Sequence, residues 1–504
     1  MSRKPSSIGT VISDNETPSF ETVRIKLKAK QDVKPGAIVR IPVSRSEKTI
    51  LIGRIQSGYE NNPYQSAVNV NISDHVGGRQ VHPKEEYSTD IFRVVEAELI
   101  EEITGTEIRA PQNLPNAGAE VFIADSNETV RVLGMETEPS KGLHIGETVS
   151  GTKTEIILKR EAIQRHFFIG GTTGSGKSYA MGVIAEELIK HKLPIIFIDT
   201  QNEYSQLVTK LKGTVKRPGY DFTIRISSLS ESELLNLLPA ATTELQKDIA
   251  ARAFSELQIE LVAEDIAKFS IDDLLKRMQI VGPLLTNNSS SVNMAISRVG
   301  SLRRNPIFGN GIDRADWRKL MVPCLAIDCK RLTSSQLQPI ATAVLRELQN
   351  LRLHNHIPPY VAVVDEAHLF VPQGEGSPCK QIIREGVRIG RHHGICMVLM
   401  TQSPIDIDRS IIRQCNTRLV FALEPDQLEA IRGVKSDASE EMLRALPKMP
   451  RGTCLLSGTY ESVKHTIPVR IRERETQDSE GGRTPDIFQQ MQDEWIPVIE
   501  NLKA

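Results

Sequence analysis

The first quarter of the chain carries short runs in which apolar and polar residues alternate. Residues 23–28 read VRIKLK, so apolar and basic side chains follow each other with the period of two that a half-buried strand requires. Further strand-like runs lie at 37–41, 50–55, 92–99, 120–123 and 130–133, with Gly, Pro and Asn clusters between them. Many short strands separated by turn residues predict a small β-barrel over residues 8–135. The basic side of 23–28 fits a solvated outer face better than a DNA contact.

From residue 166 onward the pattern changes to apolar runs separated by helical segments. This alternation predicts an α/β domain built on a parallel sheet. The expected strands are 166–170, 194–199, 221–226, 322–328, 360–365, 395–401 and 418–423. Residues 136–165 would connect the barrel to this sheet.

Residues 229–305 have a helical pattern and interrupt the strand–helix alternation. A helix is expected from Thr243 to Leu261, and Ser270-x-x-Asp273 has the spacing of a capping box that begins another. We interpret this region as a helical insertion. Near the C-terminus, a polar stretch (473–485) precedes an amphipathic segment (487–502) that Pro497 should interrupt. That segment could be an arm onto a neighbouring molecule or a helix packed on its own domain.

Composition narrows the class of protein. The 504 residues leave room for two to four domains, and 62 basic against 63 acidic residues give a net charge of −1. A nucleic-acid surface would therefore have to be local, such as a pore. The six cysteines lack C-x-x-C spacing, which indicates reduced, buried thiols. With no signal-peptide pattern and no long apolar run, we expect a cytoplasmic protein without membrane segments.

The strongest chemical signal is a phosphate-binding loop. Gly171-Thr172-Thr173-Gly174-Ser175-Gly176-Lys177-Ser178 fits G-x-x-x-x-G-K-S, with an apolar strand before it and a helix expected from Tyr179 to His191 after it. Backbone N–H groups of such a loop, and the positive end of the helix, hold polyphosphate. Lys177 should reach the β- and γ-phosphates of ATP, and the Ser178 hydroxyl should bind Mg²⁺.

Two further strand ends supply candidate catalytic groups. The run Tyr360–Val364 ends in Asp365 and Glu366, which places both carboxylates where parallel sheets bind ligands. Asp365 should hold Mg²⁺ through its water shell, and Glu366 should act as general base on the attacking water. Gln402 follows the next apolar strand and is a candidate sensor of the γ-phosphate.

Arginines near these motifs are candidates for stabilising transition-state charge. An arginine from a neighbouring subunit commonly does this in related NTPases. Arg391 is the first candidate and Arg388 the second. Arg165, just before the first strand of the sheet, could contact phosphate in its own subunit or be an ordinary flanking charge. Residues 199–204 (DTQNEY) end another strand and should face the same crevice.

Taken together, these motifs resemble the HerA family of hexameric DNA translocases, within the FtsK–HerA group of RecA-like ATPases. The resemblance rests on residues 165–178, 199–204, 365–368 and 391–404, in that order. Residues 142–146 (GLHIG) also look like that family's link from an N-terminal HAS-barrel to the ATPase. One departure is EGVRIGR at 385–391, where family members often have a shorter stretch, so the identity of the finger arginine stays open.

The resemblance implies a homohexamer with double-stranded DNA in a central pore and movement driven by ATP. It also implies a partner enzyme docked on the barrel, either a NurA-like nuclease or an NAD-degrading or nuclease effector. Such a pair would act in DNA-end processing or in anti-phage defence. The residues by themselves indicate only a Mg²⁺-dependent NTPase. The competing hypothesis is a ring scaffold that uses ATP as a switch and does not translocate; a secretion or conjugation motor is a weaker one.

The expected architecture is therefore an α/β protein with a RecA-like core, an N-terminal barrel and a helical insertion. The expected boundaries are 1–140 for the barrel, 141–228 and 306–472 for the two parts of the ATPase core, 229–305 for the insertion, and 473–504 for a linker and helix.

Overall fold

A computed structural model provides the coordinates. It describes residues 6–13, 17–29, 31–43, 49–61, 92–263, 268–309, 314–374, 377–432, 437–459 and 462–476. The chain divides into two compact units. Unit 1 comprises residues 1–160, 419–422 and 436–472, and unit 2 comprises 161–418, 423–435 and 473–504. The predicted amphipathic segment 487–502 lies outside the described residues.

Unit 1 begins with a closed β-barrel. Its strands are β1 (Gly9–Ile12), β2 (Thr22–Leu27), β3 (Ile38–Pro42), β4 (Thr49–Asn61), β5 (Phe92–Thr104), β6 (Glu107–Arg109) and β7 (Glu120–Ile123). They pair in the order β2-β1-β7-β3-β4-β5-β6, and a further pairing of β2 with β5 closes the barrel. Val23, Ile25 and Leu27 of β2 are buried in its core, as the alternation predicts.

One predicted barrel strand is wrong. Residues 130–133 belong to the helix α2 (Ser126–Leu133). Asp125 caps this helix by accepting a hydrogen bond from the N–H of Glu128, whose side chain bonds back to the cap, and Gly134 ends it in the left-handed conformation. These end signals outweigh the β-branched residues that favoured a strand.

Unit 1 also contains strands outside the barrel. The expected connector 136–165 includes β8 (Gly142–Thr148) and β9 (Glu155–Lys159), which pair with each other. β8 pairs with β18 (Ile467–Ile471), and β18 with β17 (Thr453–Gly458). Arg54 of the barrel is fully buried and donates to Asp437 and to the carbonyl of Thr466. This buried cation ties the barrel to the end of the hairpin.

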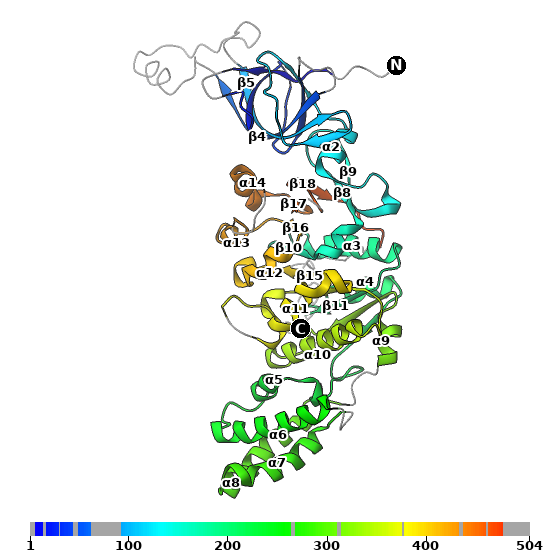
Figure 1. Cartoon of the computed structure of the whole chain (residues 1–504), viewed down its shortest axis with the longest axis vertical. Coiled ribbons are helices and arrows are strands. Elements are labelled where there is room, and N and C mark those ends of the chain that lie inside the picture. Colours follow the sequence, from blue (N-terminus) through cyan, green and yellow to red (C-terminus); the bar gives the residue numbers. More distant parts are fainter. Residues whose placement is uncertain are drawn as a thin grey trace, which may run out of the picture. The chain divides into compact units, whose positions relative to one another are not determined.

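Unit 2 is built on a parallel sheet. Its strands run in the order β12 (Thr214–Lys216), β13 (Cys324–Asp328), β11 (Ile195–Asp199), β14 (Tyr360–Val364), β15 (Ile395–Thr401) and β10 (Phe167–Gly170). The helices α3 (Lys177–Lys190), α10 (Ser334–Leu353) and α11 (Pro378–His393) connect strands of this sheet (Figure 1). Five of these six strands carry buried hydrophobic residues, and the residues of the short edge strand β12 are only partly buried. The four-residue β16 (Thr417–Val420) falls where the division between the units lies.

The predicted strand 221–226 is also wrong. The structure has only isolated bridges there, at Phe222 and Ile224, and the edge strand is β12, which the hydrophobic pattern did not indicate. Phe222 and Ile224 are buried by packing in a loop, so their apolar alternation reflects burial without a strand.

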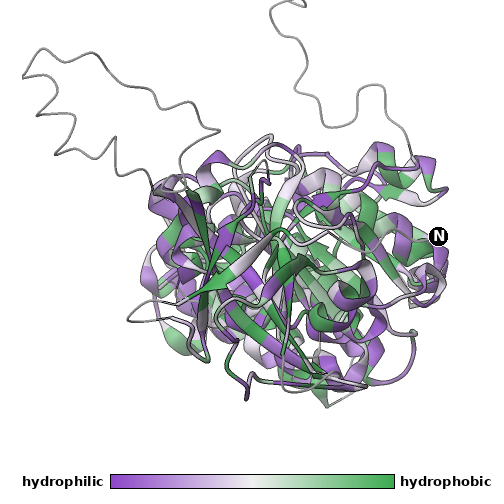
Figure 2. Cartoon of the chain, turned by 90° about the horizontal axis from the view of Figure 1, so that it is seen from above, coloured by the Kyte–Doolittle hydropathy of each residue, from purple (hydrophilic) through white to green (hydrophobic). Residues whose placement is uncertain are grey.

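The helical insertion contains α5 (Glu231–Asn236), α6 (Glu244–Val262), α7 (Ile271–Leu285) and α8 (Ser289–Gly300), drawn in green in Figure 1. Ser270 caps α7 by the predicted capping box with Asp273. In Figure 2 the strands are mostly coloured as hydrophobic and the helices show hydrophilic outer faces. These elements confirm the predicted fold class of a P-loop α/β core with an N-terminal barrel and a helical insertion.

The structure also bears on the cysteines and on the expected absence of membrane segments. All six cysteines are buried and free, as their spacing and apolar surroundings predicted. None of the helices in the described ranges is long and apolar enough to cross a membrane.

Candidate active site

The loop Gly171–Ser178 curls between β10 and α3. Gly174 and Gly176 adopt positive φ angles of 76° and 118°, a conformation that favours glycine. Lys177 is buried, and its Nζ donates to the carbonyl of Thr172 at 3.1 Å. Burial lowers the pKa of Lys177, while the nearby carboxylates of Glu366, Asp365 and Glu203 oppose that effect. The loop therefore presents a cation and backbone amides at the carboxyl edge of the sheet.

Asp365 and Glu366 follow β14 at the same edge. Both are nearly inaccessible, at 4% and 6% exposure. Burial raises the pKa of Asp365 to about 8, and the neighbouring carboxylates of Glu366, Glu203 and Asp199 add to the increase. The Thr200 hydroxyl donates to Asp365 at 2.9 Å. Such a concentration of buried carboxylates calls for a cation.

Gln402 joins the P-loop to Glu366. The Thr173 hydroxyl donates to its Oε1 at 2.6 Å, and the Gln402 N–H donates to Glu366 Oε2 at 3.4 Å. The predicted residues of the P-loop, the end of β14 and the end of β15 therefore form one cluster. The structure brings them together because parallel strands end at one edge.

Residues 199–204, for which the sequence predicts only a position facing the same crevice, also belong to this cluster. Gln201 Nε2 donates to Glu366 Oε1 at 3.0 Å, and the Ser178 hydroxyl donates to the Glu203 carboxylate. Asp199 accepts from the N–H groups of Glu203 and Tyr204 at 3.0 and 2.9 Å. In the sequence, these contacts are indicated only by the run of polar residues that follows β11, the strand next to β14.

These residues fit a magnesium nucleotide. A buried lysine with backbone amides suits the phosphates, and the Ser178 hydroxyl with the buried Asp365 carboxyl group suits a hard cation that keeps part of its water shell. Ser178 and Asp365 would hold that cation, which would neutralise charge on the phosphates.

The arginine candidates lie at the opposite edge of the sheet. Arg391 is near the C-terminal end of α11, just before β15 begins, and β15 spans about 20 Å along its seven residues. Arg388 and Arg391 are exposed, and neither has a carboxylate partner among the described residues. The structure therefore does not bring these arginines to the P-loop of the same subunit.

Arg165 also lies at this amino edge. Burial lowers its pKa, and so does the nearby guanidinium of Arg391. β10 lies between Arg165 and the P-loop, and Arg165 is near Arg391; its contact with phosphate in the same subunit stays a prediction beside the alternative of a flanking charge.

His166 is buried next to this basic edge and bonds to the backbone of β15. Its Nδ1 accepts from the N–H of Met397 at 3.0 Å, and burial lowers its pKa to about 4. A neutral ring is therefore locked between β10, β15 and α11. Gly390 allows the helix to approach, since a Cβ there would lie 2.3 Å from the carbonyl of Ile395.

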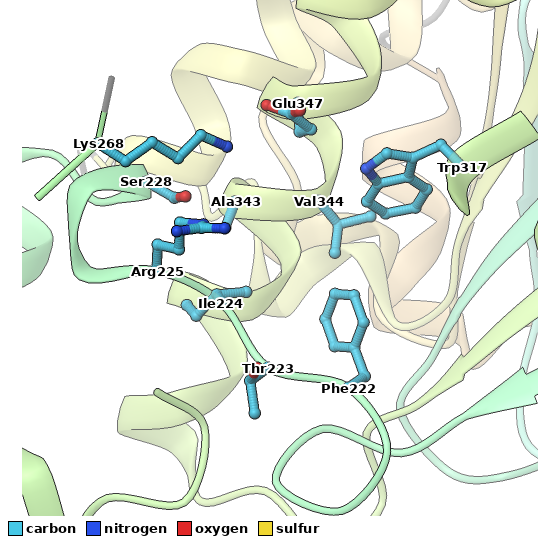
Figure 3. Close-up of a pocket in the computed structure, with 10 residues that line it drawn as sticks. All are labelled: Phe222, Thr223, Ile224, Arg225, Ser228, Lys268, Trp317, Ala343, Val344 and Glu347. Carbon is cyan, nitrogen blue, oxygen red and sulfur yellow. The ribbon is translucent and has the colours of Figure 1, made fainter. Parts of the chain in front are cut away.

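Two of the cavities formed by the described residues lie at the amino edge of the sheet and beside α10. One of about 210 Å³ is lined by Gln164, Tyr360 and Arg391 at the amino edge. The other, about 30 Å³, lies beside α10, with Lys268 and Arg225 extending towards it from one side and Trp317 from the other (Figure 3). Trp317 Nε1 has no hydrogen-bond partner in the described part of the chain, and this volume suits a single water. None of the predicted site residues lines the smaller cavity.

Comparisons with known proteins agree with these motifs. Residues 143–348 match the model of the central domain of the helicase HerA. A probable helicase of Methanocaldococcus jannaschii is 24% identical over 385 residues, with 72% of each chain covered. The DNA double-strand break repair helicase HerA of Sulfolobus acidocaldarius is 21% identical, with 83% of this chain and 86% of that protein covered.

A solved structure shows the same fold. VirB4 of Thermoanaerobacter pseudethanolicus superposes with a TM-score of 0.52 at 15% identity, covering 66% of this chain and 96% of that one. Over residues 143–348, which contain the P-loop, the chain is therefore similar to the central domain of HerA helicases, and these similarities support an ATP-hydrolysing enzyme of the helicase type.

Proposed function

We propose that this chain forms a homohexameric ring that uses ATP hydrolysis to move double-stranded DNA through a central pore. The observation that carries this proposal is the division of the ATPase machinery between two edges of one sheet. The P-loop, Asp365, Glu366 and Gln402 cluster at one edge, and the arginines lie at the other. A ring would place the arginine edge of one subunit against the nucleotide of the next.

Each residue of the cluster has a role in this proposal. Lys177 and the loop amides bind the phosphates, and Ser178 and Asp365 hold the magnesium ion. Glu366 takes a proton from the attacking water, and Gln402 contacts the γ-phosphate. Arg391, or Arg388 one turn earlier, stabilises negative charge in the neighbour's transition state.

The choice of DNA as the substrate is supported by the relatives. Those named HerA are described as helicases of DNA double-strand break repair. We extend this to duplex DNA for the present chain, and we place a partner nuclease or NAD-degrading effector on the barrel of unit 1. The pair would act in DNA-end processing or in defence against phage.

Three measurements on one preparation test the proposal. The mass of the purified protein should be that of six chains, duplex DNA should increase ATP hydrolysis, and ATP should drive displacement of a protein block from duplex DNA. A folded protein that hydrolyses no ATP in Mg²⁺, with or without DNA, would remove the enzymatic claim.

The second candidate is a ring scaffold that uses ATP as a switch, which the net charge of −1 favours. A scaffold would hydrolyse ATP and bind its partner while leaving the protein block on the DNA. Purification with the natural neighbours of the chain would show whether the bound partner is a nuclease or an NAD-degrading enzyme.

A further inference from the structure

Two segments beyond the carboxyl ends of β14 and β15 pair with each other. Residues 371–373 follow β14 and Glu366, and residues 406–408 follow β15 and Gln402. The segments are joined by two backbone hydrogen bonds, of 2.7 and 3.0 Å, and by an antiparallel bridge. The pairs are Gln373 with Asp406, Asp408 with Val371, and Pro372 with Ile407. The positions of the two segments therefore depend on each other.

Lys380 bonds to both of these segments. It lies in the first turn of α11, and its Nζ is 2.9 Å from the carbonyl oxygen of Pro372 and 2.9 Å from Asp408 Oδ2. The Lys380 side chain is 14% exposed, and that of Asp408 is 19% exposed. The positive end of a helix disfavours a cation in its first turn, so a lysine is unfavourable there unless a carboxylate compensates for it. The Lys380 ammonium group is therefore held by these contacts and is not freely solvated.

Asp408 has a second set of hydrogen bonds. Its Oδ1 accepts from the N–H and the hydroxyl of Ser410 at 2.9 and 2.7 Å, which caps the helix α12 (Arg409–Gln414). Burial works to raise the pKa of Asp408, but the hydrogen bonds from Ser410 and Lys380 outweigh burial and lower that pKa below its usual value. Asp408 therefore stays an anion, and its contact with Lys380 is a partly buried ion pair.

The turn that joins Gln402 to Asp408 is constrained by hydrogen bonds of its own. It contains a short helical turn at Pro404–Asp406, and the N–H of Asp406 donates to the carbonyl of Ser403 at 3.3 Å. Because such bonds fix backbone dihedral angles, a displacement of Asp408 also displaces the residues before it. The ion pair therefore lies at one end of a constrained turn, and Gln402, the candidate γ-phosphate sensor, lies at the other.

We propose that Lys380 is a positioning residue for ATP hydrolysis, whose ion pair with Asp408 holds the turn 403–408 so that Gln402 meets the γ-phosphate. This role rests on the proposed ATPase function and adds a residue to the same site. The alternatives are a contact between Lys380 and a DNA phosphate, or a contribution of the ion pair to stability alone. Each alternative predicts a different result when the lysine is removed.

The first experiment measures DNA-free ATP hydrolysis by Lys380→Met and by a matched control. Arg384→Met removes an exposed positive charge one turn further along α11. Loss of the hydrogen-bonded ion pair should lower the kcat of Lys380→Met about 10-fold, with KM for ATP unchanged because the phosphate loop keeps its contacts. The control should keep the unmutated kcat. An unchanged kcat in Lys380→Met, or a loss that appears only when duplex DNA is added, would overturn the positioning role.

The second experiment tests whether Lys380 acts through Gln402. The kcat values of Lys380→Met, Gln402→Ala and the double variant form a double-mutant cycle with that of the unmutated protein. If the lysine acts by placing Gln402, the double variant should have the kcat of Gln402→Ala to within about 2-fold. A further loss of about 10-fold in the double variant would mean that the two residues act independently, which contradicts the proposal.

A third measurement separates positioning from stability. Lys380→Met leaves the Asp408 carboxylate partly buried without its cation, so the Tm should fall. The double variant Lys380→Met/Asp408→Asn removes both charges, and asparagine can still cap α12, so most of the Tm should return while kcat stays low. If kcat returned together with the Tm, the ion pair would contribute to stability alone and the proposal would be wrong.

These measurements also separate the positioning role from the function on which it rests. If neither the unmutated protein nor Arg384→Met hydrolyses ATP, the proposed function fails and the role of Lys380 fails with it. If both hydrolyse ATP and Lys380→Met does so at the same rate, only the positioning role fails.

Discussion

The two edges of the parallel sheet in unit 2 differ sharply in charge and in hydrogen bonding. At the carboxyl edge the buried Lys177 lies among acidic side chains, those of Asp199, Glu203, Asp365 and Glu366. Asp365 accepts a hydrogen bond from Thr200, and Glu366 accepts one from Gln201. At the amino edge Arg165 lies beside Arg391, whose exposed guanidinium has no carboxylate partner in the described ranges. One chain therefore carries an acidic site and a separate basic site at opposite ends of the parallel strands.

This difference teaches that neither edge is complete. The carboxyl edge gathers buried carboxyl groups that a magnesium ion would use, and the amino edge carries exposed arginines near the buried His166. About 20 Å of strand lies between them, too far for an arginine side chain to cross. In the proposed ring, a second copy of the chain brings the two edges together.

The largest expected effect is the loss of nucleotide at the carboxyl edge. Lys177→Ala removes the buried lysine that the described residues place among these carboxyl groups, so affinity for a fluorescent ATP analogue should fall at least about 100-fold. Equilibrium titration checks this, with thermal unfolding to show that the variant folds. Retention of affinity would mean that the phosphates do not lie at this loop.

Removal of the base should separate binding from chemistry. Glu366→Gln keeps the shape of the side chain and loses its proton-accepting charge, so hydrolysis should fall about 10²- to 10⁴-fold with nucleotide affinity retained. Steady-state kinetics and the same titration provide both values. Hydrolysis at the unmutated rate would assign the general base to another residue.

The basic edge is tested by comparing its two exposed arginines. Arg391→Ala should lower kcat about 10³-fold and leave the ring and nucleotide affinity intact, since Arg391 lies far from its own P-loop. Arg388→Ala, one turn earlier on the same helix face, is the matched control and should have a smaller effect. The reverse order would identify Arg388 as the finger.

The smallest effect concerns stability and its pH dependence. The raised pKa of Asp365, about 8, means that the folded state holds a proton that the unfolded state loses, so stability falls as the pH rises from about 4 to 8. Asp365→Asn has no such proton. Its nucleotide-free Tm should exceed that of the unmutated protein by about 2–4 °C at pH 8.5 and by less at pH 6. An equal difference at both pH values would contradict the raised pKa.

The sequence predicted the fold and the site best where an apolar run was followed directly by phosphate-binding or acidic residues. β10, β14 and β15 were predicted because runs of three or more apolar residues preceded Gly170, Asp365 and Thr401, and the carboxyl ends of parallel strands lie at one edge. The arrangement of the P-loop, Glu366 and Gln402 at one edge followed from this topology.

Other parts depended on contacts that a linear pattern does not record. Phe222 and Ile224 alternate as in a strand but pack as a loop, and the capping signals around α2 outweighed its β-branched residues. Gln201 and Glu203 act through partners more than 150 and about 25 residues away. Arg165 precedes the P-loop by few residues but lies at the other end of the strand.

The most direct test of a site shared between copies mixes two inactive proteins. Rings assembled from Arg391→Ala and Glu366→Gln subunits contain interfaces where an intact Glu366 meets an intact Arg391, so hydrolysis should return at a level set by the fraction of such interfaces. Mixed rings that form but hydrolyse no ATP above either variant alone would contradict a catalytic site divided between the two edges.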